Sequence, residues 1–178
     1  KYLVTEAIKM MKNKRNLKHW AGRIGEAYNK AFVNNWEYYP LSQREIDFVV
    51  GNVMTIVDPD LIKIIAKDDE VVGFVFPFPD VSAAMQKNRG KLGPLAILRL
   101  LVEIRRTNWV SFNGVGILPE YQGLGGNAIM YAELEKAMHK NSQFIHSELT
   151  QVAESAEQMR KDLKNLGVSF YKNHRVFE

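Results

Sequence analysis

The hydrophobic pattern of the first thirty-five residues predicts helix. Two apolar stripes recur at helical spacing, the first made of Leu3, Val4, Ala7, Ile8 and Met11 and the second of Leu17, Trp20, Ile24, Ala27, Tyr28, Ala31 and Phe32. Residues 34–40 (sequence NNWEYYP) break this spacing and predict an aromatic loop. Ser42 and Glu45 then have the spacing of a capping box, so we expect another helix that runs towards Met54.

Further along, the pattern becomes typical of strands. Residues 61–66 and 71–76 are apolar and rich in β-branched side chains, and the acidic turn KDDE between them indicates a hairpin. Gly73 predicts a bulge in the second strand, and Pro77 and Pro79 are expected to end it. Four later segments also predict strands: residues 109–118, residues 144–149, and a final pair made of 168–171 and 175–177.

The remaining segments predict helices. Residues 81–106 form one helical stretch that restarts at Gly93-Pro94, where proline suits a first helical turn. Its second part, residues 95–104, is apolar on nearly every side, so this helix is either buried or covers something apolar. Two more helices are expected: one after residue 127, with Ala128, Ile129, Ala132, Leu134 and Ala137, and one over residues 152–166, ended by Gly167. We therefore predict one α+β domain over residues 1–178.

Composition excludes several classes of function. The chain has no cysteine, and its four histidines show no ligand spacing, so we expect neither a disulfide nor a metal site. The longest apolar run, residues 92–104, contains Arg99 and Glu103 and is shorter than the roughly 20 residues that span a bilayer. We expect no membrane partner and a cytoplasmic location. The basic residues within 1–30 lack interleaved aromatics, so a solvated helical face is favoured over nucleic-acid binding.

The segment PEYQGLGGN, residues 119–127, carries the clearest chemistry. It joins a predicted strand to a predicted helix, and the free N–H groups and dipole of a helix N-terminus attract anions. The glycines at positions 123, 125 and 126 let the backbone approach a phosphate closely. The P-loop motif G-x-x-x-x-G-K-[ST] is absent, and the dinucleotide motif G-x-G-x-x-G fails at Ala128. We therefore predict a phosphate-binding turn of another kind.

With its flanking strand, this segment resembles the acyl-CoA signature of the GNAT superfamily of N-acyltransferases, in which a strand ending V-x-P precedes [QR]-x-x-G-x-[GA]. Gln122 and Gly125 match its most characteristic positions, and Asn127 stands where the family usually has glycine or alanine. The order of the other elements is also similar. The segments Asn34-Asn35-Trp36, Phe78-Pro79-Asp80 and Glu148-Leu149-Thr150 resemble a subgroup of larger bacterial proteins, in which this domain forms the C-terminal half. A start at Lys1 rather than Met fits such a fragment.

The resemblance implies a mixed, mostly antiparallel twisted sheet flanked by helices, with acetyl-CoA or another acyl-CoA as co-substrate. The strand end at Ile117 and Leu118 would bond the pantetheine arm. The pyrophosphate would lie on the turn formed by Gln122, Gly123, Leu124, Gly125, Gly126, Asn127 and Ala128. The apolar helix over residues 95–104 is then either a buried packing helix or a lid over an acyl-chain or acceptor pocket.

The catalytic groups are harder to predict from the sequence than the binding turn. Many GNAT enzymes use a tyrosine acid, preceded by an asparagine, and the resemblance places Leu163 and Ala156 at these positions. In strand 144–149, alternation places Glu148 and His146 on one face, where Glu148 could act as a base through water and His146 is a second candidate. Tyr171 is a third candidate. The competing interpretations are an ion-paired Glu148, a half-buried His146 and a packed Tyr171.

The acceptor is expected to be a small-molecule or peptide amine. Four residues of the aromatic loop are candidates for binding it, namely Asn35, Trp36, Tyr38 and Tyr39, although such clusters are more often part of a core. We expect transfer of the acyl group by direct attack, because no cysteine is available as a nucleophile. The alternative is a GNAT-like module that binds acyl-CoA, or packs on a companion domain or a second copy, without catalysis.

Overall fold

The computed structural model describes residues 8–10, 14–35, 38–54, 56–140 and 143–175. The chain divides into two compact units, residues 1–148 and 149–178. Within the described residues, one sheet has five strands in the order β1-β2-β3-β4-β5. Three neighbouring pairs, from β1 to β4, are antiparallel. None of the described helices combines the length and apolarity that crossing a bilayer requires.

The sheet begins where the sequence pattern predicts helix. Strand β1 (Ile8–Met10) pairs antiparallel with β2 (Lys63–Lys67), so the prediction of helix over the whole N-terminal segment is wrong at residues 8–10. Pairing with a distant strand outweighs the local helical spacing there. The helix itself is α1 (Lys14–Phe32), and its buried side chains come from the predicted second stripe: Leu17, Trp20, Ala21, Ile24 and Ala27.

Helix α2 (Gln43–Val53) begins as predicted. Ser42 is its N-cap, and the Ser42 and Glu45 side chains bond each other's backbone N–H groups in a capping box. The next predicted feature, the bulged hairpin, is also present. The register of β2 and β3 (Glu70–Pro79) shifts between Ile65 and Ala66, opposite Gly73 and Val71.

Strand β3 does not end before its prolines. It continues through Pro77 to Pro79 and pairs there with β4 (Trp109–Ile117), after a register irregularity that follows Val75. The pairing of β2 with β3 extends only to Val75. Beyond that point one edge of β3 has no β2 residue to bond, so a proline that lacks an N–H is tolerated.

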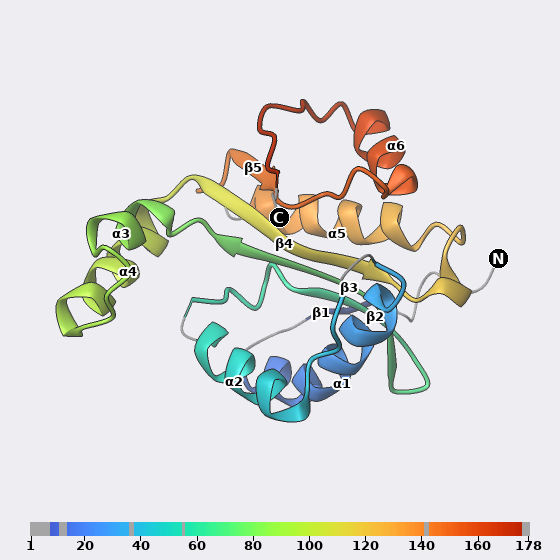
Figure 1. Ribbon diagram of the computed structural model, residues 1–178, viewed down its shortest axis with the longest axis horizontal. Helices are drawn as coiled ribbons and strands as arrows, with labels where there is room; N and C mark the ends of the chain where they lie inside the picture. Colours follow the sequence, from blue (N-terminus) through green and yellow to red (C-terminus); the bar gives the residue numbers. More distant parts are fainter. Residues whose placement is uncertain (1–7, 11–13, 36–37, 55, 141–142, 176–178) are drawn as a thin grey trace. The chain divides into compact units, whose positions relative to one another are not determined.

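Helices cover both faces of the sheet (Figure 1). On one face, α1 lies so close to β4 that a Cβ on Gly116 would come within 3.1 Å of the Ala31 side chain. On the other face lies α5 (Gly126–Lys140), whose first residue adjoins the side chains of Ile117 and Ile65. The fully buried side chains gather on β2, β3 and β4, with Met130 and Leu134 from α5.

Two further helices, α3 (Ser82–Lys87) and α4 (Pro94–Arg106), connect β3 to β4. Their bounds and the restart at Pro94 agree with the prediction, but α4 is not a buried packing helix. Only Ala96 and Leu100 are buried in it, and Leu98 is 58% exposed. Apolar composition therefore does not by itself bury this helix.

The second unit contains α6 (Glu157–Asn165), which begins later than predicted. The predicted final strand pair is wrong at residues 168–171, which form no strand, and its last two residues, 176 and 177, lie outside the described part of the chain. Phe170 is 84% exposed, so these apolar residues lack the neighbouring strand that would cover them.

Candidate functional site

The end of β4 and the turn that follows it are held by a small set of hydrogen bonds. The Leu118 N–H donates to the Val72 carbonyl at 2.9 Å, which continues the pairing of β4 with β3. A 3₁₀ turn, η1 (Pro119–Tyr121), follows, and the Gln122 side-chain amide reaches back to donate to the Ile117 carbonyl at 3.1 Å. Gln122 thus fixes the turn against the strand end.

Gly123 and Gly125 shape the turn through their backbone conformation. Their φ angles are +75° and +83°, a region that non-glycine residues rarely adopt. A Cβ added at either position would meet no atom within 4 Å, so there is open space where a side chain would point. Conformation, rather than crowding, requires glycine at both places.

Gly126 has a different reason to be glycine. A Cβ there would lie 2.8 Å from Ile117 Cδ1 and 3.0 Å from Ile65 Cδ1. Because Gly126 has no Cβ, the first turn of α5 can approach the sheet closely. The sequence pattern predicts that all three glycines allow a phosphate to approach, whereas Gly126 contributes by setting where the N-terminus of α5 lies.

The turn presents several backbone N–H groups. Within the described residues, those of Gly123, Leu124 and Gly125 donate no hydrogen bond. Gly126 and Ala128, with Asn127 between them, lie in the first turn of α5, whose N–H groups have no preceding helical carbonyl to bond. The partial positive charge of a helix N-terminus lies at the same place. Such an arrangement suits an anion, and the predicted binding of a phosphate by this turn stays a prediction.

A basic side chain that sequence analysis missed lies beside this turn. Lys67, at the end of β2, places its ammonium group 5.4 Å from the centre of the Tyr121 ring. Lys67 is exposed, so its charge can also reach a bound anion. No local pattern could have found it, because the fold alone brings together two residues so far apart in sequence.

Of the candidate catalytic residues on β5 (His146–Leu149), His146 lies far from the glycine turn. The N–H groups of Ile145 and His146 donate to the Asn108 carbonyl, and the His146 ring stacks on Trp109 with 4.6 Å between ring centres. Trp109 begins β4 and Ile117 ends it, a separation of roughly 26 Å at about 3.3 Å per residue. His146 is exposed and does not lie beside the glycine turn, whereas Glu148 is half-buried and makes a further contact.

Tyr171 belongs to the second unit. Its side chain is 58% exposed, and the Lys172 ammonium lies 4.9 Å from the centre of its ring. It is therefore not a packed strand tyrosine, and its role as an acid stays a prediction.

The predicted acceptor residues fall into different environments. The Tyr38 hydroxyl donates to Asn29 Oδ1 at 2.6 Å, and its ring lies 6.1 Å from that of Phe32 and 6.2 Å from that of Tyr28. Burial raises the pKa of Tyr38, so its hydroxyl stays protonated at neutral pH. Tyr38 thus belongs to an aromatic cluster over the sheet.

Two other loop residues are accessible, since Asn35 is exposed and Tyr39 is 83% exposed. Trp36 lies outside the described residues. The structure thus separates the predicted acceptor residues into a packed tyrosine and exposed side chains.

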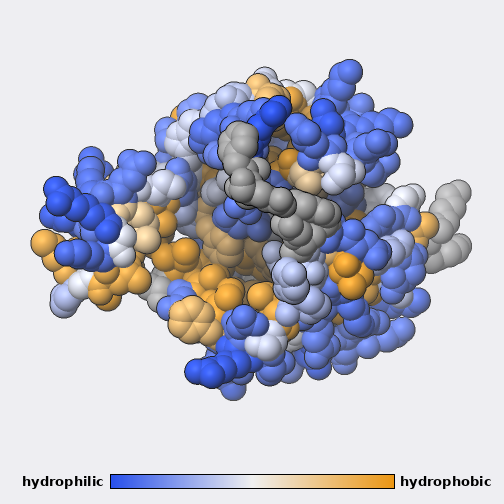
Figure 2. All heavy atoms as spheres, in the orientation of Figure 1, coloured by the Kyte–Doolittle hydropathy of each residue, from blue (hydrophilic) through white to orange (hydrophobic). Residues whose placement is uncertain are grey.

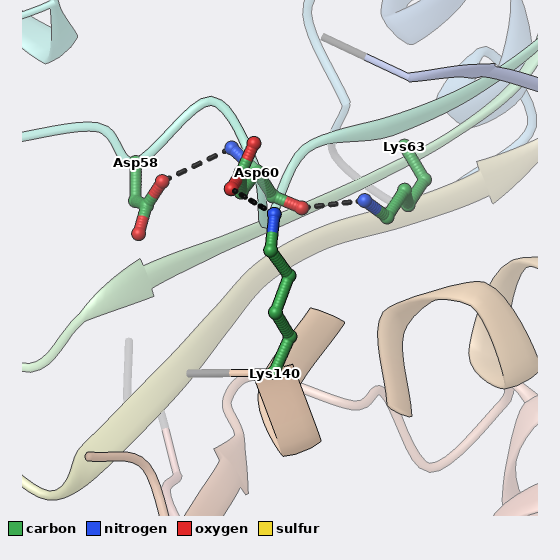
Figure 3. A network of polar contacts seen from close by, with 4 residues as sticks. All are labelled: Asp58, Asp60, Lys63 and Lys140. Atoms are coloured by element: carbon green, nitrogen blue, oxygen red, sulfur yellow. Dashed lines mark hydrogen bonds and ion pairs between the residues drawn. The ribbon is translucent and has the colours of Figure 1, made fainter. Parts of the chain in front are cut away.

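A second polar cluster lies between the start of β2 and the end of α5 (Figure 3). The Lys63 ammonium donates to the Asp60 carbonyl at 2.5 Å, and the Lys140 ammonium lies 3.6 Å from an Asp60 carboxylate oxygen. The Asp60 N–H donates to the Asp58 carboxylate at 3.0 Å. Burial lowers the pKa of Lys63, whose side chain is almost fully covered. This cluster joins β2 to α5.

No group of three or more His, Cys, Asp or Glu side chains in the described residues could hold a metal ion. The described part of the site consists of backbone N–H groups and one lysine, beside a sheet that carries one half-buried carboxylate.

The order of strands and helices, with a glycine turn between β4 and α5, is that of the GNAT acetyltransferase fold. Solved structures agree with this assignment. A possible acetyltransferase from Clostridium difficile 630 is 14% identical, with a TM-score of 0.59 over 97% of this chain and 98% of that chain. The aminoglycoside acetyltransferase AAC(6')-Iy, in complex with the bisubstrate analogue CoA-S-monomethyl-acetylneamine, is 15% identical. Its TM-score is 0.55 over 96% of this chain and 95% of that chain. The chain has the GNAT fold.

Sequence comparison adds a relative of larger size. The bacterial ceramide synthase of Caulobacter vibrioides (strain NA1000 / CB15N) is 24% identical over 160 residues, which are 87% of this chain and 42% of that protein. The chain spans about two fifths of the length of the curated relatives it matches. No family model matches the chain.

Proposed function

We propose that this chain binds an acyl-CoA through the glycine turn and transfers its acyl group to an amine. The observation that carries the proposal is the turn between β4 and α5. There, two glycines have positive φ with open space around their Cα atoms, and the N–H groups of the turn that donate no hydrogen bond adjoin the first turn of α5. A pyrophosphate has the charge and the acceptor oxygens that this arrangement suits. The complex of the acetyltransferase AAC(6')-Iy with a CoA-containing analogue, on the same fold, supports this choice of ligand.

Several groups have proposed roles in this reaction. The pyrophosphate would accept hydrogen bonds from the N–H groups of the turn, and Lys67 would add a positive charge beside it. The backbone at Ile117 and Leu118 would bond the pantetheine arm. Attack by the amine on the thioester carbonyl forms the C–N bond and expels the CoA thiolate, with the amine proton passing to a base.

Glu148 suits that base better than His146. Glu148 is half-buried, and a carboxylate can accept a proton through a water molecule. His146 is exposed and stacked on Trp109, at the start of the strand whose other end carries the turn. We therefore propose Glu148 as the base, with His146 and Tyr171 as the candidates to replace next.

The acceptor is proposed to be an amine, and the relatives suggest where to search for it. A ceramide is an amide of a fatty acid and a long-chain amino alcohol, so a ceramide synthase acylates an amine. The solved neighbours include an aminoglycoside acetyltransferase. An acceptor panel should therefore contain long-chain amino alcohols and aminoglycosides, each with acetyl-CoA and with a long-chain acyl-CoA.

Calorimetric titration with acetyl-CoA and free CoA tests the binding step. We expect the parent chain to bind both, and Gly125→Glu to weaken binding at least 100-fold, about 2.7 kcal/mol. The added carboxylate would fill the turn, repel the phosphates and impose strain at positive φ. Gly90→Glu is the matched control, because Gly90 also has positive φ and open space around it but lies in another loop. Equal binding by Gly125→Glu and the parent would refute this site.

Lys67→Ala tests the role of the lysine. We expect a decrease of several-fold in affinity for CoA, and a smaller decrease for a CoA fragment that lacks the phosphates. The same loss for both ligands would show that Lys67 acts by supporting Tyr121 rather than by its charge. Lys18→Ala, an exposed lysine of α1, is the control.

The second candidate function is acyl-CoA binding without catalysis. It is favoured by Leu163 and Ala156, which occupy the positions of the usual tyrosine and asparagine. CoA binding with no turnover on the acceptor panel would support it. Turnover that Glu148→Gln reduces, while CoA affinity stays unchanged, would support catalysis.

A further inference from the structure

The α3–α4 hairpin exposes an apolar surface that the proposed function does not use. Leu95, Leu98, Leu101 and Val102 lie on one side of α4, since their spacing of three or four residues returns to the same face. They are between 42% and 61% exposed. The buried residues of α4, Ala96 and Leu100, lie on the other side. We call these four exposed residues the α4 apolar face.

The same hairpin is strongly basic. Residues 82–106 contain one acidic residue and six basic ones, a net charge of +5 in a chain whose total is +4. The basic side chains are Lys87, Arg89, Lys91, Arg99, Arg105 and Arg106. None of them forms an ion pair with a described carboxylate, and all are exposed. In Figure 2, the part of the molecule formed by the α3–α4 hairpin carries apolar and hydrophilic residues side by side.

The α4 apolar face and the basic side chains are arranged as in a helix that lies on a lipid surface. Arg105 and Arg106 follow the α4 apolar face in the last helical turn, and Lys91 precedes it. Arg99 lies at its margin and donates to Asn88 Oδ1 at 2.9 Å, which also fixes α4 against the end of α3. Long basic side chains beside an apolar stripe can reach anionic headgroups while the stripe enters the acyl boundary.

We propose that the α3–α4 hairpin docks this protein on the surface of an anionic lipid bilayer. The charge decides between a lipid surface and a second copy of this chain. A second copy of this chain would bring another +5 hairpin against the first, which is repulsive, whereas anionic headgroups are attracted to it. The hairpin lies on the surface and does not cross it, so the absence of a spanning helix among the described residues is compatible with docking. This departs from the expectation of no membrane partner.

Flotation of the full chain with vesicles tests the proposal, and it needs neither CoA nor turnover. We expect binding to vesicles of phosphatidylcholine with phosphatidylglycerol, much weaker binding to phosphatidylcholine alone, and a decrease as salt is raised. Arg105→Gln with Arg106→Gln should weaken binding roughly 30-fold, from about fivefold for each charge. Leu98→Glu with Leu101→Glu should abolish it.

The controls are exposed residues of α2, where Phe48→Glu removes an apolar side chain and Arg44→Gln a charge. We expect both control variants to bind the vesicles as the parent does. Circular dichroism should show that every variant is folded. The proposal is overturned if the parent does not float with anionic vesicles, or if the hairpin variants float as well as the controls. It is also overturned if light scattering shows a dimer that Leu98→Glu with Leu101→Glu dissociates and that does not float.

Discussion

Helices α4 and α5 have similar lengths and opposite environments. Helix α4 is the more densely apolar, yet only Ala96 and Leu100 are buried in it, whereas α5 buries Met130 and Leu134 almost completely against the sheet. Their first turns differ too. Pro94 removes an N–H from the start of α4, while α5 starts with Gly126 and keeps its N–H groups. The sequence of a helix thus permits burial, but the surface beside it decides whether burial occurs.

The largest difference is expected in stability. Leu134 is 2% exposed and Leu98 is 58% exposed. Leu134→Ala should cost about 3 kcal/mol of the free energy of unfolding, because it leaves a cavity under α5. Leu98→Ala should change that free energy by less than about 0.5 kcal/mol. Urea denaturation measures both, and equal losses would mean that α4 is covered in solution.

A smaller effect tests the close approach of α5. Gly126→Ala should destabilise the chain by about 1 kcal/mol, because the new Cβ displaces the ends of the Ile117 and Ile65 side chains. Gly22→Ala in α1 is the matched control, since a Cβ there meets nothing and alanine favours a helix by up to about 1 kcal/mol. Thermal unfolding should move the two melting temperatures in opposite directions. A rise for both would show that the sheet accommodates the methyl group.

The smallest expected change concerns Lys63, which is buried near α5, unlike the exposed lysines of the hairpin. Its pKa is lowered, so the unfolded chain binds its proton more strongly and the penalty for burial is present at neutral pH. Lys63→Met should stabilise the chain by about 1 kcal/mol or less at pH 7.

The sign of the pH dependence follows. As pH rises through the lowered pKa of Lys63 towards its usual value of 10.5, the folded chain sheds this proton first and the penalty fades. The gain from Lys63→Met should therefore shrink between neutral pH and that value. Denaturation at several pH values, with exposed Lys18→Met as control, measures it. If the stabilisation by Lys63→Met stays constant with pH, packing rather than the charge of Lys63 causes it.

The sequence predicts most elements of the fold because their signals are local. The capping box at Ser42, the bulge near Gly73, the restart at Pro94 and the strand before the glycine turn depend on neighbouring residues and are present. The failures come from distant pairing. Residues 8–10 form a strand only because β2 offers an edge, and residues 168–171 form none.

The candidate site also combines local features, which could be predicted, with features that depend on distant residues. The turn at residues 122–128 is local, so its glycines and its helix N-terminus could be predicted. The different role of Gly126 could not, because it depends on the side chains of Ile117 and Ile65 across the sheet. Lys67 beside Tyr121, and His146 on Trp109, depend on strand order, which the sequence pattern does not contain.

The two prolines of β3 have a consequence for the behaviour of the protein at high concentration. Strand N–H groups point alternately to the two edges, and the Asp80 N–H donates to the Trp109 carbonyl on the β4 side. Positions 77 and 79 therefore face the other edge, where the pairing with β2 has already ended at Val75. An unpaired strand edge is a template for adding a strand from another molecule, and here both prolines are also buried by packing. Prolines at both positions remove the donors that such an intruding strand would need, which protects the sheet from edge-to-edge aggregation.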